Sequence, residues 1–187
     1  MRLISKLSAL VAGLTLATAP AFARVDAGTP SLIASLPRYG VNVALNHSDC
    51  NDGDRNFHGY YNTGTRAFVV CYSGTPGAND HDTVRHEAMH VAQHCVAQRS
   101  GHPYGIRTIL TGEDLDQFVS SVLTPTQIEG IKGAYPSEVH DIELEAFAGA
   151  AHYSSAQVQS IVEAWCNYDW TVTECRPYLS RGEHDCL

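Results

Sequence analysis

The sequence predicts an α+β fold, in which a small antiparallel sheet is followed by a mostly helical C-terminal half. Two β-rich runs, residues 57–61 and 66–72, flank Asn62-Thr63-Gly64, which is a hairpin signal. Apolar residues then recur at three- and four-residue steps from residue 84, and again in several runs between residues 113 and 166. This period is typical of helices that bury one face.

An export signal is expected over residues 1–23. Arg2 and Lys6 form a basic region, residues 7–16 form an apolar region, and Ala21-Phe22-Ala23 fits a cleavage site. The apolar run is too short to span a bilayer, although an N-terminal anchor helix is the alternative. Cleavage after Ala23 predicts a secreted or periplasmic protein that is not inserted in a membrane.

Residues 24–187 are expected to form a single domain. No internal repeat or low-complexity run divides them, and about 164 residues is the size of one domain with one core. Removal of Arg2 and Lys6 with the signal changes the formal charge from −8 to −10. An acidic chain without a basic cluster is a poor candidate for binding nucleic acid or an anionic membrane.

All six cysteines lie after the predicted cleavage site, and an even number in an exported chain favours three disulfides. A cysteine-rich zinc site is the competing use, but the sequence has no CxxC pair. Of the possible pairings we favour Cys50–Cys71, Cys166–Cys175 and Cys95–Cys186.

The N-terminal part should contain little regular structure apart from its strands. Residues 24–37 are expected to be a loose leader, in which Pro30 and Pro37 bracket a short apolar piece, and residues 41–45 to be a strand. Residues 46–56 are polar and rich in turn formers. Their acidic residues resemble a calcium loop only superficially, because the glycine is displaced, so an ordinary loop is favoured.

The sequence His86-Glu87-Ala88-Met89-His90 has the spacing of a metal site. Residues four apart share one face of a helix, so His86 and His90 can direct ring nitrogens at one point. Two imidazoles at this spacing are half of a zinc site, which needs a third protein ligand. Glu87 lies about 100° further round the helix, where it can act as a general base without binding the metal.

The surroundings of this motif support a helix. Asp80, Asp82 and Thr83 precede it and offer N-cap oxygens. An apolar stripe lies on the face opposite His86, Glu87, His90 and His94, and it consists of Val84, Ala88, Val91, Ala92 and Cys95. The alternative is a surface helix whose histidines are aligned by chance.

Four helices are expected after the motif, over residues 113–123, 125–134, 137–153 and 156–166. Thr124 should cap the second, and Ser154 or Ser155 the last. The tail from Asn167 should be irregular and held by disulfides.

The third ligand is sought in the helix that contains Glu143 and Glu145. These two glutamates are about 200° apart on a helix, so only one can face the metal. Small residues at Ala146, Ala148 and Gly149 border Glu145 and allow another helix to approach closely. Glu145 is therefore the predicted ligand and Glu143 is expected to point away, with a solvated Glu145 as the alternative.

The motif at residues 86–90, with Gln93 after it, resembles the active helix of the zincin metallopeptidases in its HExxHxxQ form. Glu145-Ala146, with Ala148 and Ala150, is similar to the third-ligand helix of the gluzincin type. The resemblance covers roughly residues 57–153. It implies a sheet packed on the active helix with an edge strand along the cleft, zinc held by His86, His90 and Glu145, and hydrolysis of a protein or peptide by zinc-activated water with Glu87 as general base.

The chain departs from related patterns at several positions. Gln93 and Val96 occupy the places of the glycine and third histidine of the metzincin motif. Gly149 stands where thermolysin-like enzymes have an acidic residue, so the group that orients a ligand histidine is expected elsewhere, at Asp141 or Asp82.

His152 or Tyr153 is a candidate donor to the developing oxyanion, and a surface role for both is the alternative. Zinc is favoured over magnesium or calcium, because imidazole is a poor ligand for hard cations. Two other interpretations of the chain remain open. One is a non-catalytic exported domain that binds metal or peptide at the same site, and the other is a disulfide-braced interaction domain in which the motif is accidental.

Overall fold

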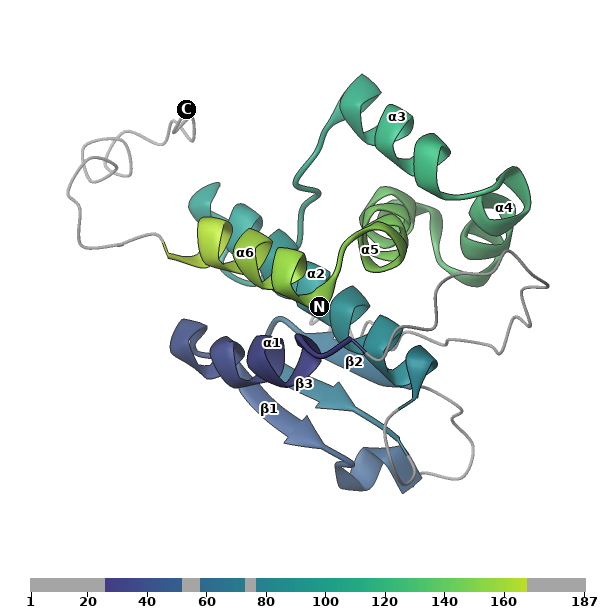
Figure 1. The fold of residues 1–187 in the computed structure, drawn as a ribbon. Helices are drawn as coiled ribbons and strands as arrows, with labels where there is room; N and C mark the ends of the chain where they lie inside the picture. The colour runs from purple at the N-terminus through teal and green to yellow at the C-terminus, as the bar shows by residue number, and fades with distance from the viewer. Residues whose placement is uncertain (1–25, 52–57, 73–76, 168–187) are drawn as a thin grey trace, which may run out of the picture.

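The computed structural model describes residues 26–51, 58–72 and 77–167, and these form an α+β fold with a small sheet, as predicted (Figure 1). The strands are β1 (Asn42–Leu45), β2 (Gly59–Asn62) and β3 (Ala67–Val70). The α-helices are α1 (Thr29–Ser35), α2 (Ala78–Arg99), α3 (Gly112–Val122), α4 (Pro125–Ala134), α5 (His140–His152) and α6 (Ser155–Cys166). Three 3₁₀ segments are η1 (Leu36–Tyr39), η2 (Ser48–Asn51) and η3 (Ser137–Val139).

The sheet is mixed, not wholly antiparallel. Strands β2 and β3 form the predicted hairpin, with Tyr60 opposite Val69. Strand β1 pairs parallel with β3 on the other side, with Val43 opposite Phe68, which gives the order β1-β3-β2. The hairpin occupies one edge of β3, so β1 takes the remaining edge and β2 becomes an edge strand.

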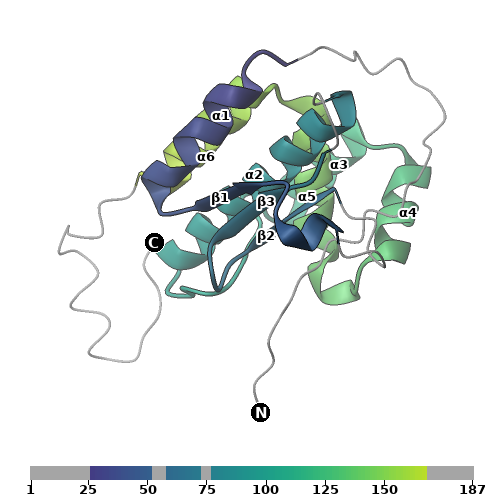
Figure 2. The same cartoon turned by 90° about the horizontal axis from the view of Figure 1, so that it is seen from below.

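Residues 29–37 form α1 and the start of η1 and contribute to the core, so the prediction of a loose leader was wrong for them. Pro30 stands in the first turn of α1, where its missing N–H costs nothing and its fixed φ suits a helix. Leu32 and Leu36 are fully buried in the cluster that also contains Phe68. Helix α1 lies alongside α6 (Figure 2).

Helix α2 is the central element of the fold, and it packs against the sheet, α1, α5 and α6 (Figures 1 and 2). The predicted apolar stripe packs into the main core through Val84, Ala88, Val91 and Ala92. The helix begins earlier than the predicted caps, at Ala78. Asp80 still supports its start, because its carboxylate accepts a hydrogen bond from the N–H of Gly77 at 2.7 Å.

Gly59 brings strand β2 into close contact with α2. A Cβ at this position would lie 2.8 Å from Thr83 Cγ2 and 2.7 Å from the carbonyl oxygen of Val69. Glycine is therefore needed here for close packing between a strand and the helix that carries the motif.

The helices after α2 lie close to their predicted bounds. Thr124 and Ser154 cap α4 and α6, each accepting from the third residue of its helix. A second apolar cluster, which includes Leu115, Leu144 and Ala148, joins α3 and α4 to α5. Helix α5 is thus enclosed between α2 and the α3–α4 pair (Figure 1).

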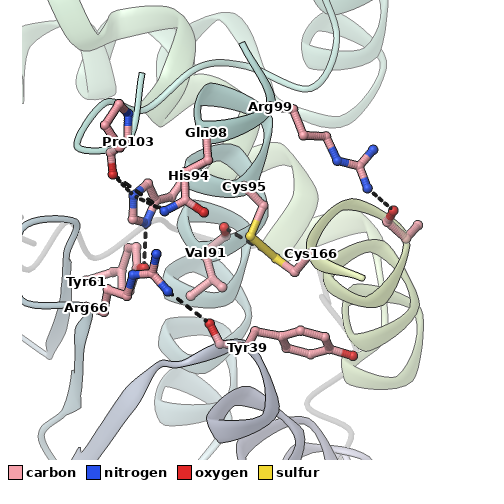
Figure 3. Close-up of a disulfide and its surroundings, with 11 residues drawn as sticks. Tyr39, Tyr61, Arg66, Val91, His94, Cys95, Gln98, Arg99, Pro103 and Cys166 are labelled. Atoms are coloured by element: carbon pink, nitrogen blue, oxygen red, sulfur yellow. Dashed lines mark hydrogen bonds between the residues drawn. A yellow bond between two sulfur atoms is a disulfide. The ribbon is translucent and has the colours of Figure 1, made fainter. Parts of the chain in front are cut away.

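Two disulfides lie within the described residues. The Cys50–Cys71 bond was predicted correctly. Cys95 pairs with Cys166, not with Cys186, and the predicted Cys166–Cys175 bond is wrong for the same reason (Figure 3). Helix α6 packs along α2 and places the two Cα atoms 5.3 Å apart, which only the tertiary structure reveals.

The predicted signal, residues 1–23, and Cys175 and Cys186 lie outside the described residues. Among the described helices, none combines the length and the apolar character that crossing a membrane requires.

Candidate metal centre

The motif on α2 faces the interior of the protein. His86, Glu87 and His90 are 4, 1 and 5% exposed. The helical spacing brings the two Nε2 atoms to 3.1 Å from each other, as the sequence pattern requires. Three polar side chains on a buried face need partners, and the neighbouring helix α5 supplies one.

That partner is Glu143, not the predicted Glu145. One carboxylate oxygen of Glu143 lies 3.3 Å from Nε2 of His86 and 3.6 Å from Nε2 of His90. The expectation that Glu143 points away from the histidines was wrong. In the described chain, His86, His90 and Glu143 form the one group of this kind whose ligand atoms converge closely enough to hold a metal ion.

Glu145 is equally buried but faces another way. Its carboxylate accepts hydrogen bonds from the amide of Gln93 and from the backbone N–H groups of Ile109 and Leu110, at 2.8, 2.8 and 2.7 Å. The sequence placed the ligand on the side of α5 that carries the small residues. Because α5 is enclosed, both carboxylates are buried, and each is stabilised by different neighbours.

The three ligand atoms have the spacing of a tetrahedral metal site. Bonds of about 2.0–2.2 Å to a tetrahedral zinc place neighbouring ligand atoms roughly 3.3–3.6 Å apart. The observed separations are 3.1, 3.3 and 3.6 Å. Apart from the two imidazoles, no hydrogen-bond donor in the described residues contacts the Glu143 carboxylate. Two imidazoles and a carboxylate in this arrangement can hold a metal ion.

Without a metal, protons compensate the charge of this cluster. Burial disfavours the charged form of His90, but the neighbouring Glu143 carboxylate outweighs it and raises the pKa of His90 to about 9. Burial likewise opposes ionisation of Glu143, yet the charge and hydrogen bonding of His90 and His86 hold its pKa well below the ordinary value. A divalent cation would replace this proton between the same groups.

Glu87 lies beside the cluster without joining it. Burial raises the pKa of Glu87, although the nearby histidines oppose the shift. Neither of its carboxylate oxygens has a side-chain hydrogen-bond partner in the described part of the chain, and its hydrogen-bonding neighbour is the backbone of Tyr61. Glu87, His90 and Glu143 line one cavity of about 280 Å³. A basic carboxylate beside a metal-ligand cluster, at the wall of a cavity, can take up and release a proton.

Comparisons with protein families, with curated proteins and with solved structures found no match to this chain.

Besides α2, three parts of the chain form the walls of the cavity. Strand β2 and its turn contribute Tyr61, Asn62 and Thr63, and the segment after α2 contributes residues 104–106. The third part is η3 with the start of α5, whose lining residues are Glu138, Val139 and Ile142. Tyr104 is 76% exposed at the rim. The cavity therefore runs from strand β2 at the edge of the sheet to His90 and Glu143.

His94, the last histidine of α2, holds two of these walls in place. Its Nδ1 accepts from the Tyr61 hydroxyl at 2.7 Å, and its Nε2 donates to the carbonyl oxygen of Pro103 at 2.9 Å (Figure 3). Burial lowers the pKa of His94, which favours the neutral ring that this pattern needs. His94 thus connects strand β2 and the segment at residue 103 to α2.

The polar residues predicted around the metal lie elsewhere. Asp82 pairs with Arg85, and Asp141 is exposed, so neither reaches a ligand histidine. Tyr153 stacks on Phe118 and His152 contacts the same ring edge-on, away from the lining of the cavity. Gln93 fills the orienting role instead, with its Oε1 atom 2.7 Å from Nδ1 of His90.

Tyr135 is a polar residue that sequence reasoning missed. Its hydroxyl is buried without a hydrogen-bond partner among the described residues. Burial, together with the charges of Glu143 and Glu87, raises its pKa, so it remains a protonated donor. Its ring contacts Phe147, which in turn packs 4.3 Å from the ring of His86. The position of Tyr135, between α4 and α5, carried no sequence signal.

Proposed function

We propose that this protein is a zinc-dependent peptidase of the zincin type whose metal is held by His86, His90 and Glu143. The observation that supports the proposal best is the tetrahedral spacing of these buried ligand atoms next to Glu87 in a cavity. The proposal keeps the role predicted for the motif and replaces Glu145 with Glu143. It also keeps the export signal, which agrees with the two disulfides.

Zinc is the metal of choice because imidazole suits borderline-soft cations better than magnesium or calcium. When bound, zinc lowers the pKa of water and polarises a carbonyl oxygen. Glu87 supplies the proton transfers: its carboxylate accepts a proton from water and returns it to the leaving amine. Burial raises the pKa of Glu87, which brings its basicity closer to the neutral range in which such transfers are efficient.

The substrate is proposed to be an extended peptide. Strand β2 is an edge strand, and its residues Tyr61 and Asn62 line the cavity beside Glu87. The free edge of a strand offers N–H and C=O groups to which a peptide can add as another strand. Tyr135 does not line the cavity, but the charges of Glu143 and Glu87 act on its buried, unpartnered hydroxyl. It is the proposed donor to the carbonyl oxygen as that oxygen gains negative charge.

The test compares the parent with three variants for bound zinc and for hydrolysis of an unfolded protein, with and without a chelator. The parent should bind zinc and show chelator-sensitive hydrolysis. Glu143→Ala should lose both. Glu87→Gln should keep zinc and lose about 10²–10⁴-fold in rate. Glu138→Gln is the matched control, since this exposed glutamate lines the same cavity but has no role in metal binding or proton transfer. Zinc binding without hydrolysis in the parent would refute the peptidase and leave a metal-binding domain.

A further inference from the structure

Gln93 is buried one turn after His90 and makes three hydrogen bonds. Its Oε1 lies 2.7 Å from Nδ1 of His90. Its Nε2 lies 3.0 Å from the carbonyl oxygen of Ile142 and 2.8 Å from Oε2 of Glu145. A side chain with no exposed surface and all these contacts has a single orientation.

The partners determine which way the amide points. The carbonyl oxygen of Ile142 can only accept, and the Glu145 carboxylate accepts from two backbone N–H groups as well. Both therefore need the NH₂ group, and the amide oxygen must face His90. An amide oxygen cannot donate, so Nδ1 of His90 carries the hydrogen. The lone pair of the neutral ring is then on Nε2, the atom that faces His86 and Glu143.

His86 provides a contrast within the same site. Its Nδ1 is buried and has no hydrogen-bond partner among the described residues. His90 is thus the ligand whose ring is fixed by a hydrogen-bond chain. The chain starts at the backbone of Ile109 and Leu110 and runs through Glu145 and Gln93 to His90.

We propose that Gln93 and Glu145 are positioning residues that hold His90 in the tautomer and ring orientation which bind the metal through Nε2. The inference rests on the proposed metal site and adds a role for the glutamate that is not a ligand. Glu145 acts on the metal only through Gln93, by keeping the amide in the orientation that accepts from His90. Through Ile109 and Leu110 it also ties the segment that follows the cavity wall at residues 104–106 to the same chain of bonds.

The test measures zinc affinity in variants that change this chain. Gln93→Met keeps the length of the side chain and removes both hydrogen-bonding ends, and it should weaken zinc binding about 10–100-fold. Gln98→Met is the matched control on the same helix, because Gln98 contacts His94 and not a ligand. It should bind zinc like the parent. The exchange Gln93→Glu with Glu145→Gln again places an acceptor at His90 and a donor–acceptor pair between the two positions. It should recover part of the affinity that Gln93→Glu alone loses, because the carbonyl oxygen of Ile142 still lacks the donor that Gln93 provides.

The second readout is the tautomer itself, observed by nitrogen-edited NMR of the zinc-bound parent. We expect His90 to show a slowly exchanging Nδ1–H and a metal-bound Nε2. This signal should vanish or exchange rapidly in Gln93→Met. A purely structural role for Gln93 would lower thermal stability without changing the signal. If Gln93→Met does not fold, the parent spectrum still decides.

Two results would overturn the inference alone: a parent in which Nδ1 of His90 binds zinc, or a folded Gln93→Met with the affinity of the parent. A parent that binds no zinc would overturn the proposed metal site and this inference together. The parent titration therefore separates the two failures.

Discussion

Glu143 and Glu145 are buried to the same extent on the same helix, yet their removal should affect different properties: Glu145→Ala mainly the free energy of unfolding, and Glu143→Ala mainly zinc binding. Glu145→Ala takes away the acceptor for Gln93 and for the backbone N–H groups of Ile109 and Leu110. An unsatisfied buried donor costs about 1–3 kcal/mol. Gln93 retains Ile142, and Ile109 and Leu110 are half-buried, so water can replace part of the loss. We therefore expect metal-free Glu145→Ala to lose about 2–4 kcal/mol of unfolding free energy.

Glu143→Ala should change the stability of the metal-free protein less. Glu143 accepts hydrogen bonds from no backbone group in the described residues, and its neighbours are the two imidazoles. Without the carboxylate, the pKa of His90 falls, and the ring loses the proton that would otherwise be a buried unpaired charge. The same substitution removes one of three ligands, so zinc binding should be lost.

The assay is urea unfolding of the metal-free variants, followed by zinc titration of each one that folds. Glu145→Gln is the control, because its amide keeps one acceptor oxygen and should lose less stability than Glu145→Ala. The argument would be refuted by a Glu145→Ala protein of parental stability that cannot bind zinc, combined with Glu143→Ala that can. That pair of results would restore Glu145 as the ligand.

Three further predictions concern other parts of the molecule. Replacing Cys95 and Cys166 by alanine should lower the free energy of unfolding by about 4 kcal/mol, because the disulfide closes a loop of 71 residues. Urea unfolding measures the change, and parental stability would contradict the prediction. Partial burial opposes ionisation of Asp26, but hydrogen bonding from Ser155 outweighs it and lowers the pKa of Asp26. The ionised Asp26 should therefore contribute its full stabilisation of the fold above the ordinary pKa of 3.8, and lose it as the pH falls through the pKa of the folded protein. The stability difference between the parent and Asp26→Asn should then shrink in acid, and a difference independent of pH would contradict it. Tyr135→Phe should keep zinc and lower kcat about 10²–10³-fold, and an unchanged kcat would exclude the hydroxyl as a donor.

Local patterns in the sequence were enough to predict most helices. Thr124 and Ser154 indicate where α4 and α6 begin, because they are N-caps. The spacing of the apolar residues in α2 indicates which face of that helix is buried. The hairpin of β2 and β3 was predictable for the same reason, since its turn residues lie between the strands. The pairing of β1 with β3 depends on which edge the hairpin leaves free, and no local signal reports that.

The candidate site was predictable only on α2. His86 and His90 meet because four residues make about one helical turn, whereas the choice between Glu143 and Glu145 depends on how α5 rotates against α2. Phe147, four residues after Glu143 on the same face, packs on His86 and was the sequence signal that could have indicated this rotation. The small residue Gly149 instead contacts Met89. The stripe of small residues therefore marked the helix contact correctly but not the metal ligand.

The central claim is that His86, His90 and Glu143 hold zinc. Its most direct test is an anomalous difference map from crystals of the zinc-loaded protein, measured at the zinc absorption edge. We expect a single strong peak about 2.0–2.2 Å from Nε2 of His86, Nε2 of His90 and a carboxylate oxygen of Glu143, with Glu145 still hydrogen-bonded to Gln93. A peak that Glu145 ligates, or a zinc-loaded crystal with no peak between α2 and α5, would contradict it.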